Sequence, residues 1–196
     1  MCELSLTKSV LLTDLTLCVN RYRLFTPGIY VCVCIPVSLD DETRFIAGLV
    51  AQVNHGRLKQ CEATEKGFIG PPNFVLDVFE SNEMDEYEKR KAAYGRSGVI
   101  EYVAVIADDE VRCEWNRHNG TDFEAVAPDE NGVIKSKAMP GLWFSTDHLA
   151  KRDWWAMGDM IERGISRLGH HEFMETIWHK EGRKKDSADW FPFDAG

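Results

Sequence analysis

A carboxylate inside an apolar segment is the most informative chemical feature of this 196-residue sequence. Asp77 lies in Phe74-Val-Leu-Asp-Val-Phe79, a nearly continuous apolar run that predicts a strand covered on both faces. Burying an isolated charge is costly, so Asp77 needs a partner. A charged amphipathic stretch follows, and as a helix it can bring Arg90 back toward Asp77. Asp77 is therefore either half of a structural ion pair or the surviving acid of a metal-dependent site.

The segments before Asp77 predict a helix and a set of strands. Apolar residues recur at helical spacing over 9–24, and Thr26-Pro-Gly28 ends that helix. The β-branched residues of 29–36 indicate a strand. Residues 45–53 favour a second extended segment, although a short helix fits nearly as well, and a short strand is expected over 58–61.

The segments after Asp77 predict a crossover unit. A mostly solvated helix is expected over 84–96, with Tyr87, Lys91 and Tyr94 along one face, followed by strands over 99–107 and 111–115. Strand, helix and strand in this order favour parallel pairing inside a mixed sheet. The remaining expected elements are a peripheral β region over 123–144, helices over 146–165 and 170–179, and a loosely tethered charged and aromatic tail over 181–196.

Length, composition and charge favour one globular domain, 1–180, followed by the tail 181–196. The chain is 44% hydrophobic, which fills one core, and its net charge of -9 argues against a protein whose main work is coating nucleic acid. No apolar run reaches the roughly 20 residues of a membrane span, and the N-terminus lacks a signal-peptide pattern, so we expect a cytoplasmic protein with no membrane partner. The six cysteines lie mostly in apolar segments and are expected to be free thiols.

The motifs around Asp77 resemble a known family. Gly70-Pro-Pro-Asn-Phe-Val-Leu-Asp-Val-Phe79, Tyr94 and Gly98-Val-Ile-Glu-Tyr102 are similar to the core signature of the Uma-type restriction-endonuclease family, in the PD-(D/E)XK nuclease superfamily. The resemblance extends over most of the chain. Its further segments are Arg21-Tyr-Arg-Leu, Thr26-Pro-Gly28, Ala127-Pro-Asp-Glu-Asn-Gly132, Ser136, Pro140-Gly-Leu-Trp143 and Arg163-Gly-Ile with His170.

The resemblance implies a restriction-endonuclease-like α/β fold, in which a mixed β-sheet is flanked by helices, with a β appendage and C-terminal helices. It also implies Mg-dependent hydrolysis of nucleic-acid phosphodiesters. Two carboxylates on adjacent strands would hold magnesium, which lowers the pKa of its bound water, and a lysine would stabilise developing negative charge. Carried over by position, Asp77 is the second acid and metal ligand, Arg90 stands at the lysine position, and Tyr94 completes the catalytic set.

This sequence departs from the pattern at the positions that matter most. The first acid falls on Ile46, no acid lies between Thr43 and Cys61, and Asn73 stands where relatives often carry an acid. Lys89 and Lys91 flank Arg90 but point about 100° away around a helix. One carboxylate binds a divalent cation poorly, and a guanidinium prefers to grip a carboxylate bidentately. These departures predict a weak or inactive nuclease in which Asp77 and Arg90 form a neutralised ion pair.

Three readings stay open from the sequence. Asp40, Asp41, Glu42 or Glu80 could supply the missing ligand and preserve catalysis. A non-catalytic module could instead bind nucleic acid or a protein partner through the old cleft. A homodimeric structural protein could use aromatic residues of the C-terminal helices as its interface.

Other residues with chemical potential have simpler interpretations. Cys32 and Cys34 are spaced for one strand face rather than for zinc, and His170-His171 diverge on a helix, so structural roles are expected. Tryptophans 143, 154, 155 and 178 could stack on bases but favour core packing, with one or two left for a partner subunit. The basic run of Lys180, Arg183, Lys184 and Lys185 is typical of a solvated tail.

Overall fold

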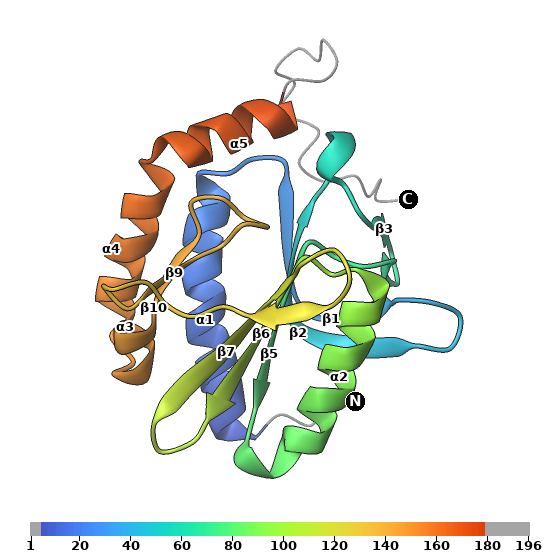
Figure 1. Ribbon diagram of the computed structural model, residues 1–196, viewed down its shortest axis with the longest axis horizontal. Helices are drawn as coiled ribbons and strands as arrows, with labels where there is room; N and C mark the ends of the chain where they lie inside the picture. Colours follow the sequence, from blue (N-terminus) through green and yellow to red (C-terminus); the bar gives the residue numbers. More distant parts are fainter. Residues whose placement is uncertain (1–4, 179–196) are drawn as a thin grey trace.

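The apolar segments pair into one mixed sheet, which is the centre of the computed structural model; the structure describes residues 5–178 (Figure 1). The strand order is β3-β4-β1-β2-β5-β6-β7-β8, and a separate two-stranded sheet joins β9 and β10. The strands are β1 Ile29–Ser38, β2 Arg44–Val53, β3 Glu62–Thr64, β4 Gly67–Ile69, β5 Phe74–Phe79, β6 Glu101–Ala107, β7 Val111–His118, β8 Phe123–Ala125, β9 Val133–Lys135 and β10 Trp143–Ser145.

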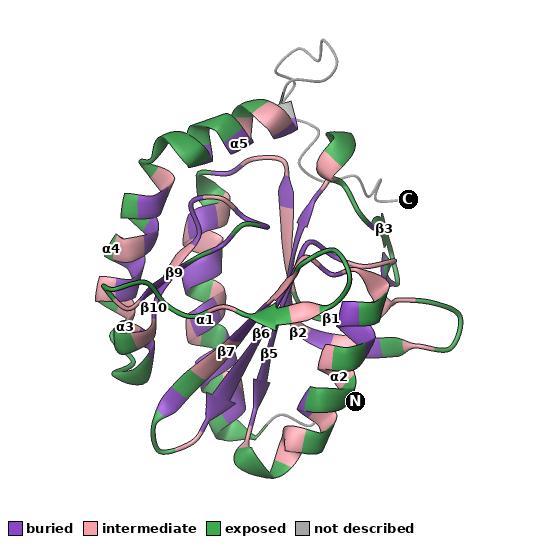
Figure 2. Cartoon of the chain, in the orientation of Figure 1, coloured by how far each residue is buried: buried purple, intermediate pink, exposed green. Residues whose placement is uncertain are grey.

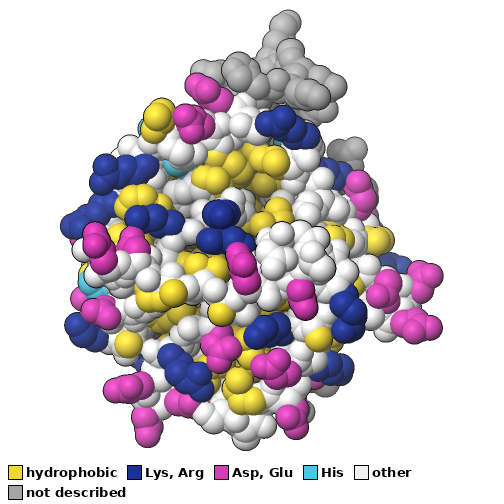
Figure 3. Space-filling model, viewed as in Figure 1, with side chains coloured by type: hydrophobic (Ala, Val, Ile, Leu, Met, Phe, Trp, Pro, Cys, Tyr) yellow, Lys and Arg dark blue, Asp and Glu magenta, His cyan; other side chains and the backbone are white. Residues whose placement is uncertain are grey.

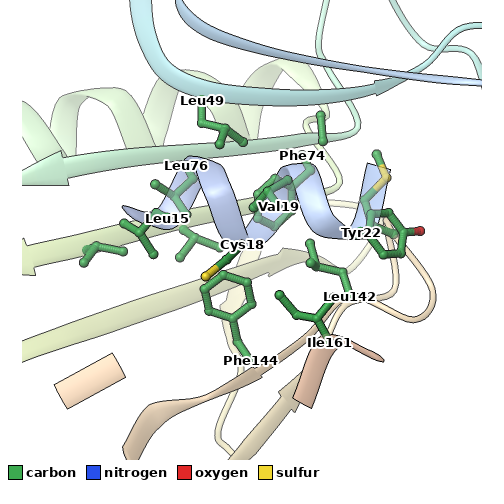
Figure 4. Packing of buried hydrophobic residues seen from close by; sticks show 14 of the residues in the cluster. Leu15, Cys18, Val19, Tyr22, Leu49, Phe74, Leu76, Leu142, Phe144 and Ile161 are labelled. Atoms are coloured by element: carbon green, nitrogen blue, oxygen red, sulfur yellow. The ribbon is translucent and has the colours of Figure 1, made fainter. Parts of the chain in front are cut away.

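Helix α1, Leu6–Leu24, covers one face of this sheet, and helix α2, Met84–Ser97, covers the other (Figure 1). Buried residues of α1 such as Leu15 and Val19 pack on Leu49 and Leu76 of the sheet, as Figure 4 shows. The short helix α3, Thr146–Ala150, and helices α4, Trp154–Ile165, and α5, Leu168–Trp178, complete this layer. The central strands are buried on both faces because two separate apolar clusters cover them (Figure 2).

The predicted crossover unit is present. Strand β5 runs parallel to β6 through α2, and β1 runs parallel to β4, whereas every other strand pair of the described chain is antiparallel. Asp77 lies opposite Ala104 in this register, on the face that α2 covers. The α/β architecture with a mixed sheet flanked by helices, a β appendage and C-terminal helices is thus confirmed.

Several sequence predictions need correction in detail. The segment 58–61 is not a strand, because a 3-10 turn, Gly56–Leu58, precedes β3, which begins at Glu62. The helix expected over 146–165 is two helices, separated at Arg152, whose φ of 52° is left-handed. The extended segment favoured over 45–53 is confirmed as β2, and the helical alternative is excluded. Helix α2 is more buried than expected, since Tyr87 and Tyr94 are fully covered. The predicted tail, 181–196, lies outside the described residues.

The β1–β2 hairpin reverses its faces at one point. Cys34 has a φ of 48°, and the pairing register is interrupted where it would meet Gly48. Before Cys34, Tyr30 and Cys32 face the apolar cluster that α2 covers. After Cys34, toward the turn, Ile35 and Val37 face the same cluster. The alternation of inward and outward side chains therefore shifts by one residue on both strands, and Gly48 marks the shift on β2.

The start of the chain is tied to the connection between β5 and α2. Lys8 Nζ donates to both oxygens of Glu83 at 2.7 Å, and the Ser5 hydroxyl donates to Glu80 Oε1 at 2.5 Å. Burial acts to raise the pKa of Glu83, but Lys8 and the backbone N–H of Glu80 outweigh it and leave the pKa lowered. These contacts join the two helical layers at one end of the sheet.

Many residues outside the Asp77 region that carry the family resemblance gather in one buried junction. Tyr22 Oη donates to the carbonyl of Pro140 at 3.0 Å, and its ring meets the ring of His170 edge to face. Thr26 Oγ1 lies 2.9 Å from His170 Nε2. Burial, followed by the neighbouring His171, lowers the pKa of His170 and keeps it neutral at pH 7. His170 thus has the structural role expected of it.

Gly164 of α4 lets this junction close. A Cβ on Gly164 would lie 2.2 Å from the carbonyl oxygen of Gly141 and 2.8 Å from Cγ of Trp143. Residue 164 must be glycine for α4 to approach the segment before β10 this closely.

Gly164→Ala is expected to lower the free energy of unfolding by about 1–3 kcal/mol, because the backbone of Gly141 cannot move aside cheaply. Urea denaturation measures it. Gly169→Ala is the matched control in α5, where an added Cβ meets nothing within 4 Å, and it should leave stability unchanged or raised. Equal losses in both variants would contradict the packing described.

None of the described helices has both the length and the apolar character that crossing a membrane requires.

Candidate functional site

The site around Asp77 lies where β2 separates from β5. The two strands pair at Leu49 with Leu76, Val50 with Val75 and Ala51 with Phe74, and the pairing stops there. Toward the start of β2, the Gly48 N–H and the Ile46 carbonyl bond to side chains, those of Asp77 and Arg90, instead of to the backbone of β5.

Asp77 supplies an acceptor to one side of this split. Its Oδ1 accepts the backbone N–H of Gly48 at 2.6 Å. Its Oδ2 accepts Nη1 of Arg90 and the hydroxyl of Tyr102, each at 3.2 Å. The residue is only 3% exposed. Both carboxylate oxygens are therefore engaged by donors of the protein.

Arg90 supplies the matching donors from α2. Its Nη1 donates to the carbonyl of Ile46 at 2.8 Å as well as to Asp77, and its Nε donates to Glu86 at 2.8 Å. Its side chain is 18% exposed. The guanidinium lies over the rings of Phe45 and Phe79, at 5.2 and 6.0 Å from their centroids. The ion pair predicted from the sequence is present, but Arg90 contacts Asp77 through one nitrogen and does not grip it bidentately.

The ion pair takes the place of a missing stretch of strand pairing. A buried backbone N–H or C=O that loses its ladder partner must find another, because leaving it unmade costs about 1–3 kcal/mol. Here the carboxylate accepts from Gly48 and the guanidinium donates to Ile46. Asp77 and Arg90 together therefore close the gap between β2 and β5.

The position expected for the first acid lies beside the Asp77 pair. Ile46, the position expected from the sequence, contributes its backbone carbonyl to Arg90. Gly48 is the residue of β2 that touches the Asp77 carboxylate, and a Cβ there would lie 2.9 Å from the carbonyl oxygen of Leu76 and 3.3 Å from Asp77 Oδ1. Because Asp77 lies over Gly48, β2 has no space for a second carboxylate at this point without a shift of β5.

Three fully buried tyrosines line the site beneath α2. Tyr94 and Tyr102 have ring centroids 4.9 Å apart, and Tyr87 stacks on Tyr102 at 6.1 Å. Tyr94 was expected at the site and is there, but its buried hydroxyl makes no well-formed hydrogen bond to any described residue. Tyr102, which holds Asp77 directly, was seen in the sequence only as part of a motif; its place opposite Val75 on β6 was the missing information.

Burial dominates the electrostatics of the pair. Desolvation raises the pKa of Asp77, and Arg90, the Gly48 N–H and the Tyr102 hydroxyl only partly oppose it. Burial would lower the pKa of Arg90, but the charges of Asp77 and Glu86 outweigh it and leave the pKa raised. Burial, and after it the charge of Asp77, also raises the pKa of Tyr94 and of Tyr102. Both tyrosines are therefore neutral hydroxyls at physiological pH.

These residues do not fit a magnesium ion. Magnesium requires several oxygen ligands in octahedral geometry. Asp77 and Glu86 are the two carboxylates here, and they contact different nitrogens of one guanidinium, so Arg90 is the cation they share. Within residues 5–178, no group of three or more His, Cys, Asp or Glu side chains is arranged to hold a metal.

The acids considered as substitute ligands have other partners. Asp40 Oδ1 accepts the backbone N–H of Glu42 and Thr43 in its own turn, which lowers the pKa of Asp40. Asp41 and Glu42 are exposed in the same turn. Glu80 accepts from Ser5 and shares a capping box with Glu83. Asn73 is structural, since its amide joins Val53, Leu58 and Gln60.

A second buried carboxylate, Glu101, was not singled out from the sequence. It is fully covered and lies on the α1 face of β6, opposite to the face of Asp77. Its Oε1 accepts Nε of Arg117 and the backbone N–H of Lys137, and its Oε2 accepts the Ser136 hydroxyl. Every contact is to a structural donor, so Glu101 holds the segment after β9 in place. The presence of this charge within the otherwise apolar run 99–107 was the signal that could have identified it.

The remaining candidates are structural or peripheral. Burial raises the pKa of Cys61 to about 12, which makes it an unreactive thiol. Lys135 and Arg167 lie over the ring of Trp143, at 4.9 and 5.7 Å from its centroid. Trp154 is partly buried, whereas Trp155 is 84% exposed. The basic run 180–185 and the side chain of Trp178 lie outside what the structure describes.

Comparison with known proteins identifies the fold. No family model and no curated protein matches the sequence. Among solved structures, the chain is similar to a protein from Anabaena variabilis ATCC 29413 described as a putative nuclease belonging to DUF820. The TM-score is 0.52, the sequence identity is 9%, and the match covers 81% of this chain and 83% of that chain. The chain therefore has a nuclease-like fold, while its membership in the Uma-type family stays a prediction.

Proposed function

We propose that this chain is a nuclease-fold protein that has lost phosphodiester hydrolysis and acts by binding. One observation carries the proposal: the carboxylate of Asp77, on the α2 face of the sheet, is engaged on both oxygens by Gly48, Arg90 and Tyr102. A metal-dependent nuclease needs its acid groups facing a divalent cation and a water molecule. In this chain the acid faces a permanent cation of the protein.

The energetic argument supports the same reading. A metal ion would have to displace Arg90 from Asp77 and leave the carbonyl of Ile46 without its donor. In exchange the metal would gain one carboxylate ligand, or two if Glu86 also left Arg90 to bind it. Magnesium also needs space for its water ligands. The guanidinium keeps its charge at any pH that proteins tolerate, so no proton release would open the site.

Binding through the old cleft has less support than binding elsewhere. Asp77 is covered, and Arg90 and the rings of Phe45 and Phe79 lie around it. The face in Figure 3 carries Lys, Arg, Asp and Glu side chains interspersed, rather than a continuous basic surface of the kind that tracks a phosphate backbone. A protein partner fits these charges better than nucleic acid does.

We expect the unmodified protein to cleave plasmid DNA, single-stranded DNA or RNA in magnesium or manganese no faster than the Asp77→Asn variant. This variant, purified in parallel, measures the background. Manganese titration followed by electron paramagnetic resonance should likewise reveal no site that Asp77→Asn abolishes. Metal-dependent cutting that disappears in Asp77→Asn would refute the proposal and restore the hydrolase reading.

Arg90→Met should lower the free energy of unfolding by about 3–5 kcal/mol, because it leaves Asp77 buried without its cation. Lys89→Met, one residue away but 68% exposed, should change stability little. Urea denaturation of both variants makes the comparison. A residue kept for catalysis can often be replaced with a gain in stability, whereas a structural residue cannot. A neutral or stabilising Arg90→Met would therefore count against a structural role for Arg90.

The stability deficit of Arg90→Met should be smaller at pH 5 than at pH 7. Because the pKa of Asp77 is raised, the folded protein binds the carboxyl proton more tightly than the unfolded chain does. The folded state therefore loses stability as the pH rises from the pKa of the unfolded chain through the pKa of the folded protein. Removing Arg90 removes the largest influence that opposes burial, and the pKa of Asp77 rises further. Acidification then protonates Asp77 and relieves the variant. Urea midpoints at the two pH values test this, and a deficit that grows on acidification would contradict it.

A further inference from the structure

The outer face of α1 is apolar although it points away from the sheet. Val10, Leu17 and Leu24 are exposed, and successive members are seven residues apart. Leu6, 81% exposed, adds to the same side of the helix. Such spacing gives one stripe along a helix and is typical of a helix that packs on another helix. The opposite face of α1 already packs on the sheet, so the stripe is a second, separate apolar surface (Figure 4).

Helix α4 widens this surface at its middle. Trp155 is 84% exposed and borders a pocket of about 210 Å³ between α1 and α4. The pocket is lined by Asp14, Leu17, Cys18, Arg21, Trp154, Trp155 and Gly158. We call the stripe and this pocket the α1 face. An exposed tryptophan next to an apolar stripe marks an interaction surface rather than ordinary solvent exposure.

The charges on the α1 face are arranged for a copy of itself. Asp14 and Arg21 lie on the same flank of α1, seven residues apart, on either side of Leu17. Leu17 is also midway between Val10 and Leu24. A two-fold axis perpendicular to α1, at the level of Leu17, would relate two copies of the helix in antiparallel orientation. It would bring Leu17 against Leu17, Val10 against Leu24, and Asp14 against Arg21 of the other copy.

The intramolecular contacts leave this pairing open. Arg21 Nε already donates to Glu162 at 3.1 Å, which holds the guanidinium at the edge of the pocket. Asp14 has no ion pair within residues 5–178. A second copy would supply the cation that Asp14 lacks, twice per dimer.

We propose that the α1 face is the interface of a homodimer, with two α1 helices packed antiparallel around Leu17 and with Trp155 extending the contact onto α4. The occupant is a second copy because the face is self-complementary in both its apolar spacing and its charges. At 19 residues, α1 is about 28 Å long, which suits an interface of ordinary size when α4 contributes as well. The C-terminal aromatic residues thus contribute through Trp155, while the first helix supplies the centre.

Sedimentation equilibrium of the full-length protein tests the interface. The unmodified protein should form a dimer in the micromolar range, and Leu17→Glu should raise the dissociation constant roughly tenfold or more, because it places two like charges at the axis. Ile69→Glu is the matched control, since Ile69 is also exposed, at 57%, but lies on β4, beside the edge strand β3 and outside the α1 face. It should leave the dimer intact. Circular dichroism checks that both variants fold.

A charge exchange tests the register. Asp14→Lys alone faces Arg21 of its copy, and Arg21→Glu alone faces Asp14, so each variant should dimerise more weakly than the unmodified protein. Mixed together they form a heterodimer in which both charge pairs are attractive, and native mass spectrometry should detect that heterodimer above either homodimer.

A monomer at every concentration, or a dimer that Leu17→Glu leaves unchanged, would overturn the proposal. A dimer weakened by Leu17→Glu but without preferential heterodimer formation would overturn the antiparallel register.

Discussion

The split between β2 and β5 is the constraint around which this molecule is arranged. Backbone pairing between β2 and β5 ends at Leu49 and Leu76. Beyond this point, the Gly48 N–H and the Ile46 carbonyl would be costly to bury without hydrogen-bond partners. Asp77 and Arg90 satisfy them, and Tyr102 and Glu86 hold the pair in turn. The residues that the nuclease pattern would assign to a metal centre are thereby committed to the backbone of the sheet.

The sequence was sufficient to predict this pair but not its partners. Asp77 is a charge in an apolar strand, and burial alone demands a cation, which the following helix offers at Arg90. The opposing residue on β2 depends on a register between segments 29 residues apart, which no local pattern specifies. The alternation of faces along β1 and β2 also changes at Cys34 and Gly48, so alternation counted from one end of β2 does not carry through to the other. The contacts of Tyr102 with Asp77 and of Glu101 with Arg117 depend on strand registers of the same long-range kind, so they were not predicted.

The family resemblance was a better guide to architecture than to chemistry. Tyr22, Thr26, Pro140 and His170 meet in one buried junction, closed by the contact of Gly164 with Gly141. Such residues are constrained by packing and by buried hydrogen bonds, which any chain of this fold must satisfy. The sequence departs from the family pattern instead at the first acid and at the lysine position, where Ile46 and Arg90 stand.

The tether between Lys8 and Glu83 has a mechanical consequence. Lys8 belongs to the helix on one side of the sheet, and Glu83 immediately precedes the helix on the other side that carries Arg90. The two layers are therefore in direct contact at one end of the sheet, in addition to packing on its opposite faces. A shift of α1 at this end would therefore strain the Lys8–Glu83 pair and act directly on the turn from which α2 begins.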